Sequence, residues 1–170
     1  MDLEKYIRNV PDWPQQGVQF KDLTTLWKDK SAFKESIDIL WRRYKDLEIT
    51  KVIGAEARGF IVASPLAYVL GAGFVPVRKK GKLPYRQVEV TYDLEYGQDT
   101  LTVHEDAIER GERVLIVDDL LATGGTLKAM ISLVEKMGGT VAEAAFLVEL
   151  EFLGGREGID IPLFSIVKYG

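Results

Sequence analysis

The residues best suited to chemistry lie in one short stretch, in which the acid pair Asp118-Asp119 precedes Thr123-Gly124-Gly125-Thr126. Glycines let the backbone approach a ligand closely, and the two threonine hydroxyls can donate hydrogen bonds, so the turn suits an anion such as phosphate. Two adjacent carboxylates would repel a phosphate unless they had another task, such as accepting hydrogen bonds from a sugar diol or orienting the water molecules of a metal ion. A phosphoribosyl group carries a phosphate and a free vicinal diol, so it matches both the glycine-rich turn and the acid pair.

This stretch is predicted to lie between a strand and a helix. Val114-Leu115-Ile116-Val117 is an apolar run typical of a strand buried on both faces of a parallel sheet, and the acid pair is expected to end it. A helical face follows the glycines, formed by Leu127, Met130, Ile131 and Val134, with Gly138-Gly139 closing the helix. This order brings backbone N–H groups and the positive end of a helix dipole to one point. The alternative is that the acids merely begin a helix and the glycines form an ordinary turn.

A second unit of the same kind is predicted around Arg58. Val52-Ile53-Gly54 is typical of a short buried strand, and Ala55 to Phe60 leads from it into an apolar helix that ends near Gly71. The small residues of this turn and the planar guanidinium of Arg58 suit a phosphate, although a plain surface arginine is the simpler alternative. Farther along, Arg78-Lys79-Lys80-Gly81-Lys82 is a basic run, and such runs are most often only solvated.

Strand-like and helical patterns alternate along the rest of the chain. Leu3 to Val10 can form a short helix, and Ser31 is expected to cap a longer one whose core stripe is Phe33, Ile37, Leu40, Trp41 and Tyr44. Further strands are expected at Phe74–Val77, Val141–Leu150 and Leu163–Val167. Pro84 to Val103 alternates around Tyr96-Gly97-Gln98-Asp99 and is expected to form a hairpin suited to a mobile lid. The pattern predicts an α/β fold, doubly wound, with a mainly parallel sheet flanked by helices and ligands at the carboxyl ends of the strands.

Composition narrows the possible functions. A chain of 170 residues that is 46% hydrophobic suits one domain, residues 1–170, with a real core. A net charge of −4 argues against a general nucleic-acid binder, and the absence of cysteine excludes disulfides and thiolate sites. His104, the only histidine, cannot form a zinc site beside Glu105 and Asp106 alone. Without a signal peptide or a membrane-length apolar run, a cytoplasmic protein with no membrane partner is expected.

The string from Val117 to Thr126, Val-Asp-Asp-Leu-Leu-Ala-Thr-Gly-Gly-Thr, resembles the phosphoribosyl-diphosphate signature of the type I phosphoribosyltransferase family, in the form that its adenine-specific members carry. Further motifs extend the similarity from Asp12 to about Glu157. The resemblance implies a ribose-phosphate site formed by Asp118, Asp119, Ala122, Thr123, Gly124, Gly125 and Thr126. It implies a pyrophosphate site formed by Glu56, Ala57, Arg58, Gly59, Arg78, Lys79 and Lys82, with a cis peptide bond between Glu56 and Ala57.

Other segments acquire roles only through this resemblance. By composition, Gly17–Asp22 is a surface connector with Phe20 tucked into the core. In the family the matching segment forms the purine pocket, so the resemblance implies that Phe20 stacks on the base while the backbone at Gln19 and Lys21 contacts the edge of the base. It also implies that residues 1–30 form a purine-side hood and residues 83–103 a flexible lid. Glu95, otherwise a simple turn acid, would handle the proton of the purine ring.

The implied reaction transfers ribose 5-phosphate from phosphoribosyl diphosphate to adenine and releases AMP and diphosphate. Its catalytic residues would be Glu95, Arg58, Asp118 and Asp119. Its cofactor would be magnesium, held mainly by substrate and water near the acid pair, and family precedent implies a homodimer. The alternatives are a member acting on hypoxanthine, guanine, xanthine or orotate, a nucleotide-sensing regulator of the same fold, and a plain phosphate-binding domain. Members that use 6-oxopurines carry a lysine near the strand Val141–Leu150, and its absence here favours a 6-aminopurine.

Overall fold

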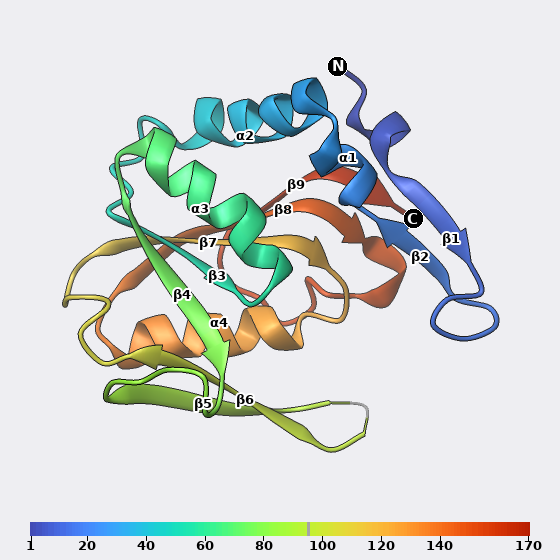
Figure 1. Cartoon of the computed structure of the whole chain (residues 1–170). Helices are drawn as coiled ribbons and strands as arrows, with labels where there is room; N and C mark the ends of the chain where they lie inside the picture. Colours follow the sequence, from blue (N-terminus) through green and yellow to red (C-terminus); the bar gives the residue numbers. More distant parts are fainter. Residues whose placement is uncertain (95) are drawn as a thin grey trace.

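A seven-stranded sheet lies at the centre of the computed structural model, which describes residues 1–94 and 96–170 (Figure 1). The strands follow the order β5 (Gln87–Asp93), β6 (Gln98–His104), β4 (Gly73–Lys79), β3 (Lys51–Ala55), β7 (Arg113–Leu121), β8 (Thr140–Leu150) and β9 (Leu163–Tyr169). The five strands from β4 to β9 in this order run parallel, and the hairpin β5–β6 joins antiparallel to the end of β4 at Arg78 and Lys79. The predicted hairpin and mainly parallel sheet are both confirmed.

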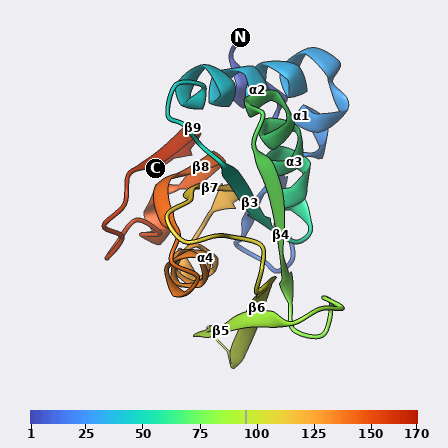
Figure 2. The same ribbon diagram turned by 90° about the vertical axis from the view of Figure 1, so that its left-hand side faces the viewer.

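Helices cover both faces of this sheet (Figures 1 and 2). α1 (Thr24–Lys28), α2 (Lys30–Tyr44) and α3 (Arg58–Leu70) lie on one face, and α4 (Gly125–Lys136) lies on the other. Each face has its own cluster of buried apolar side chains, which is why the strand β7 between them is apolar on both sides. The doubly wound α/β fold is thereby confirmed. None of the helices within the described residues is long and apolar enough to cross a membrane.

The first residues of the chain differ from the sequence prediction. Only η1 (Leu3–Tyr6) is helical, and it is a 3₁₀ turn rather than a helix that reaches Val10. β1 (Arg8–Pro11) instead pairs antiparallel with β2 (Gln19–Asp22), and Val10 lies opposite Phe20. Pairing with a distant segment satisfies the backbone of Arg8 to Pro11, so a strand replaces the predicted helical turn. This small sheet projects from the central one near the carboxyl end of the chain (Figure 1).

Several predicted element ends were also wrong. β7 does not end at the acid pair but continues to Leu121, because its last residues pair with Val148 and Glu149 of β8. The N-cap of α2 is Asp29 rather than Ser31, since the Asp29 carboxylate accepts hydrogen bonds from the amides of Ser31 and Ala32.

One side chain of α2 and the turn of the hairpin also lie differently from the prediction. Trp41 was predicted in the core stripe of α2 but is 37% exposed. Gln98 and Asp99, predicted in the turn, belong to β6, where they pair with Asp93 and Tyr92.

Gly54 allows α3 to approach the sheet closely enough to place Arg58 at its edge. A Cβ atom on Gly54 would lie 2.7 Å from the Cβ of Ala63 in α3 and 3.2 Å from the carbonyl oxygen of Val117 in β7. Only a glycine leaves room for this contact between helix and strand. The start of α3 and the end of β7 therefore meet at the carboxyl edge of the sheet.

Candidate active site

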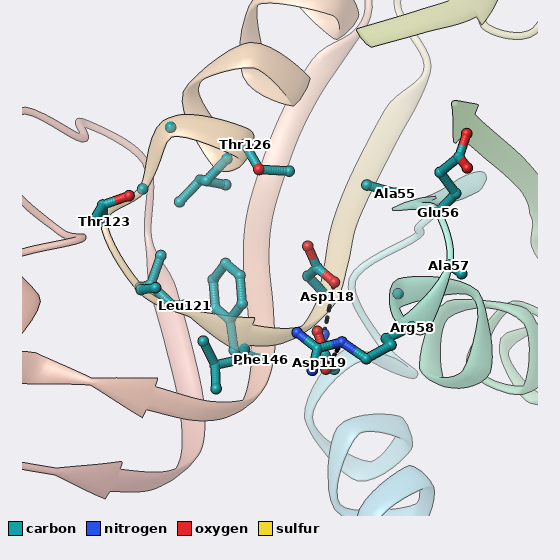
Figure 3. A pocket seen from close by; sticks show the side chains of 16 residues that line it. Ala55, Glu56, Ala57, Arg58, Asp118, Asp119, Leu121, Thr123, Thr126 and Phe146 are labelled. Carbon is teal, nitrogen blue, oxygen red and sulfur yellow. Dashed lines mark hydrogen bonds and ion pairs between the residues drawn. The ribbon is translucent and has the colours of Figure 1, made fainter. Parts of the chain in front are cut away.

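A cavity of about 270 Å³ opens at the carboxyl ends of β3 and β7 (Figure 3). Its lining consists of the turn between β3 and α3, the end of β7, the turn into α4 and one side chain of β8: Ala55, Glu56, Ala57, Arg58, Gly59, Asp118, Asp119, Leu120, Leu121, Ala122, Thr123, Gly124, Gly125, Thr126, Leu127 and Phe146. Both predicted anion-binding turns thus surround one space. The peptide bond between Glu56 and Ala57 is cis, as the resemblance implied.

The turn into α4 presents backbone amides to this cavity. Gly124 has a φ of +87°, in the left-handed region that glycine tolerates, and it precedes the first residue of α4, Gly125. Because glycine has no capping side chain, the first amides of α4 are left for a ligand, at the positive end of the helix dipole. Thr123 and Thr126 lie on either side of this turn (Figure 3). The geometry suits a bound phosphate dianion.

The acid pair lies across the cavity from this turn and is desolvated. Asp119 is 3% exposed, and its Oδ2 lies 3.1 Å from the Nε atom of Arg58. Asp118 faces the cavity, and its Oδ1 accepts a hydrogen bond of 2.9 Å from the Asp119 amide. Desolvation, followed by the neighbouring charge of Asp119, raises the pKa of Asp118 well above its ordinary value. Desolvation also raises the pKa of Asp119, although Arg58 opposes that shift.

The basic run lies beside the cavity rather than in its lining. Glu56 connects the two, because its Oε1 accepts hydrogen bonds from the Lys79 amide at 2.7 Å and from the Arg78 Nε at 3.3 Å. Lys79 also forms an ion pair with Asp99, and this hydrogen-bonded contact raises the pKa of Lys79. Three of these cations were predicted in the pyrophosphate site. Arg78 and Lys79 are the last two residues of β4, Lys82 follows that strand, and none of the three contributes to the cavity wall.

The predicted purine segment also lies outside the cavity lining, and Arg58 links the two. Phe20 is only partly buried, and its ring packs edge-on against Trp13, with ring centroids 4.5 Å apart. The guanidinium of Arg58 lies 5.8 Å from the centroid of the same ring. The side chain of Lys21 lies over the ring of Tyr169, and its Nζ donates to Asn9, which in turn donates to Gln19. Glu95, the predicted proton acceptor, lies outside the described residues.

Sequence reasoning assigned no role in the site to four large apolar residues of the cavity wall. Leu127 and Phe146 belonged to apolar runs that predicted only core packing, and Leu120 and Leu121 stood in the Val117–Thr126 string without a role of their own. Phe146 reaches the cavity because β8 pairs with β7 at Asp118, a register that no local pattern contains. An apolar wall beside charged groups excludes water and strengthens their electrostatic interactions.

Stability of the ligand-free protein is predicted to decrease as the pH rises through the range in which the buried acid pair ionises. Because the pKa of Asp118 and that of Asp119 are raised above the ordinary value of 3.8, the folded protein retains protons that the unfolded chain has already released. The free energy of unfolding therefore falls with increasing pH in that range and recovers below it. Melting temperatures measured against pH should show a shallower decline for Asp118→Asn, and identical slopes for both proteins would contradict the assignment.

Two anion-binding turns, one acid pair between them and a doubly wound sheet define the site of a type I phosphoribosyltransferase. The model of the phosphoribosyl transferase domain family matches residues 23–159. A protein named adenine phosphoribosyltransferase from Desulfosudis oleivorans is 54% identical over 170 residues, which cover 99% of this chain and 98% of that protein. Another protein of that name, from Thermotoga neapolitana, is 57% identical over 169 residues, which cover 98% of this chain and 99% of that protein.

Solved structures agree with these relatives. The adenine phosphoribosyltransferase of Thermoanaerobacter pseudethanolicus superimposes with a TM-score of 0.95 at 48% identity, covering 99% of this chain and 98% of that one. The adenine phosphoribosyltransferase of Saccharomyces cerevisiae, solved with adenine and an imino-altritol bisphosphate, superimposes with a TM-score of 0.92 at 37% identity. The match covers 97% of this chain and 96% of that one. The chain belongs to the adenine phosphoribosyltransferase family.

Proposed function

We propose that this protein forms AMP and diphosphate from adenine and phosphoribosyl diphosphate. One observation carries the proposal: both anion-binding turns and the acid pair between them line the same cavity. The donor has the matching groups, since it carries a phosphate at one end, a diphosphate at the other and a vicinal diol between them. The adenine specificity named for the relatives, together with the absence of lysine in β8, supports adenine as the acceptor.

The donor would span the cavity between the two turns. Amides and hydroxyls from Thr123 to Thr126 would bind the 5-phosphate at the start of α4. Asp118 and Asp119 would accept hydrogen bonds from the ribose hydroxyls. In support, the Oδ2 of Asp119 is buried and, apart from its ion-pair contact with Arg58, accepts no hydrogen bond from the described residues, so a bound hydroxyl would satisfy it.

The diphosphate would lie against the cis peptide turn from Glu56 to Gly59. Arg58 begins α3 there, and its guanidinium would exchange the ion pair with Asp119 for the diphosphate oxygens. Arg78, Lys79 and Lys82 would add positive charge from beside the cavity. Loss of diphosphate leaves positive charge on the anomeric carbon, and the acid pair would stabilise this charge electrostatically.

Magnesium suits this site as an ion held mainly by substrate and water. Within the described part of the chain, no three His, Cys, Asp or Glu side chains are grouped to hold a metal by themselves. The carboxylates of Asp118 and Asp119 are hard oxygen donors, and they can orient the water molecules of an ion bound to the donor. When bound, magnesium supplies charge that neutralises the departing diphosphate. Asp118 and Asp119 would hold the ribose hydroxyls whether or not magnesium is bound.

The remaining parts of the proposal concern the acceptor and the assembly. Residues 1–30 would act as the purine-side hood of a single domain, in which Phe20 stacks on adenine and the backbone of Gln19 and Lys21 contacts the edge of the base. Residues 83–103 would close as a lid and bring Glu95 to the purine proton. A homodimer and a cytoplasmic location stay predictions from the sequence and the family resemblance.

A side-by-side assay of acceptor bases tests this function. Purified protein is incubated with phosphoribosyl diphosphate, magnesium and one of adenine, hypoxanthine, guanine or orotate, and both nucleotide and diphosphate are measured. We expect rapid AMP formation with adenine, and rates lower by about 100-fold or more with the other bases, because unpaired polar groups oppose their binding. A preference for hypoxanthine or guanine would contradict the proposed acceptor. No diphosphate release with any base would contradict the proposed activity.

A further inference from the structure

A buried ion pair ties down the connection between β8 and β9. Glu149, near the end of β8, is 2% exposed and accepts hydrogen bonds from Arg156, at 2.5 Å from Nε and 2.7 Å from Nη2. The hydroxyl of Ser165, on β9, donates to the same carboxylate at 2.6 Å. These contacts outweigh the desolvation of the carboxylate, so the pKa of Glu149 lies below its ordinary value. The connection is therefore anchored to both strands through one charged group.

This anchored connection lies directly against the turn into α4. A Cβ atom on Gly155 would lie 2.5 Å from the carbonyl oxygen of Ala122 and 3.0 Å from the side chain of Leu121. Conversely, a Cβ atom on Gly124 would lie 2.4 Å from the carbonyl oxygen of Gly155. The two backbones are thus in van der Waals contact, with a glycine on each side. Gly155 therefore cannot move toward the turn without displacing the residues that present amides to the cavity, and if it moved away the turn would lose its outer support.

We propose that Glu149, Arg156 and Ser165 are positioning residues for the 5-phosphate site. They hold Gly155 against the outer side of the turn from Ala122 to Gly124, and this contact fixes the direction of the amides at the start of α4. The inference rests on the proposed function, because it assigns the 5-phosphate to this turn. A glycine-rich turn has little rigidity of its own, so a preorganised site needs such support from outside its lining.

The same strand offers a matched control. Glu143, in the first half of β8, is 6% exposed and forms an ion pair with Arg43 of α2, at 2.6 Å between Oε1 and Nη2. The hydroxyl of Tyr44 also donates to this carboxylate. The Arg43 pair resembles the Arg156 pair in charge, burial and strand, but it joins α2 to the sheet and has no contact with the turn into α4. Loss of either arginine leaves one buried carboxylate unpaired, which destabilises both proteins for the same reason.

The test measures binding of ribose 5-phosphate by titration calorimetry, since this probe lacks both base and diphosphate. Four proteins are compared at full length: the wild type, Arg156→Gln, Gly155→Ala and Arg43→Gln, each with its melting temperature. We expect the dissociation constant to rise about tenfold or more in Arg156→Gln and Gly155→Ala, as small displacements of positioned groups typically cost. Arg43→Gln should bind within about twofold of the wild type despite a lower melting temperature.

Kinetics provide a second readout that a general loss of stability would not reproduce. In Gly155→Ala the KM for phosphoribosyl diphosphate should rise while the KM for adenine stays unchanged. Wild-type affinity in Gly155→Ala or in folded Arg156→Gln overturns the proposal, and so does an equal loss of affinity in Arg43→Gln. If Arg156→Gln does not fold, Ser165→Ala replaces it in the same comparison with the same criterion, because it removes one anchor of Glu149 and leaves the ion pair intact. Failure of the wild type itself to bind ribose 5-phosphate would instead overturn the proposed function.

Discussion

Asp119→Asn is expected to lower kcat by about 100-fold or more while leaving the melting temperature almost unchanged, because its charge serves the transition state rather than the fold. The carboxylate is desolvated and carries a raised pKa, so its ionised form is unfavourable in the ligand-free protein. Removal of that charge costs the fold little. In the bound state, the same charge would lie beside the positive anomeric carbon, and a neutral amide cannot replace it. The measurements are steady-state kcat with adenine and a thermal melt.

Glu143→Gln provides the control for this prediction. Glu143 is also a buried carboxylate paired with an arginine, but it lies outside the cavity. We expect this variant to lose melting temperature and to keep kcat within about twofold of the wild type, since distant sites behave independently. If Asp119→Asn instead lost stability and turnover in parallel, Asp119 would be a structural residue and not a catalytic one.

Gly124→Ala is expected to raise the KM for phosphoribosyl diphosphate on the order of 100-fold, because the turn into α4 can no longer keep its shape. The residue has a φ of +87°, a conformation that costs an alanine about 1–2 kcal/mol. In addition, the new Cβ atom would lie 2.4 Å from the carbonyl oxygen of Gly155, which is backbone and cannot rotate away. The turn must therefore move, and its amides move with it. Steady-state kinetics with each substrate varied would measure the effect.

Gly111→Ala separates the cost of the left-handed backbone conformation from the cost of the contact with Gly155. Gly111 has a φ of +84°, and a Cβ atom there would meet no other atom within 4 Å. This variant bears the conformational cost alone, at a turn that does not line the cavity. A small loss of melting temperature with an unchanged KM is the expected result. A comparable rise in KM in Gly111→Ala would show that general strain, rather than the contact with Gly155, explains the first variant.

Local patterns in the sequence were sufficient to predict the strand, turn and helix elements that carry the site. The apolar run Val114–Val117, the glycine pair after it and the helical spacing from Leu127 each depend on neighbours in the chain, and they predicted the strand, turn and helix that the structure contains. The turn around Arg58 followed in the same way. The element ends were less predictable: pairing with β8 extends β7 to Leu121, and pairing with β2 converts the expected helix before Val10 into a strand.

The amino-acid sequence alone therefore determined the type and order of the elements that carry the site and the residues able to bind an anion, because hydrophobic periodicity and glycine conformation are local properties. Only the tertiary structure decided which of those residues meet. The ion pair of Arg58 with Asp119, the place of Phe146 in the cavity wall and the contact of Gly155 with the turn at Gly124 each join segments that are distant in the chain. Strand order and register create these contacts, and no local pattern contains that information.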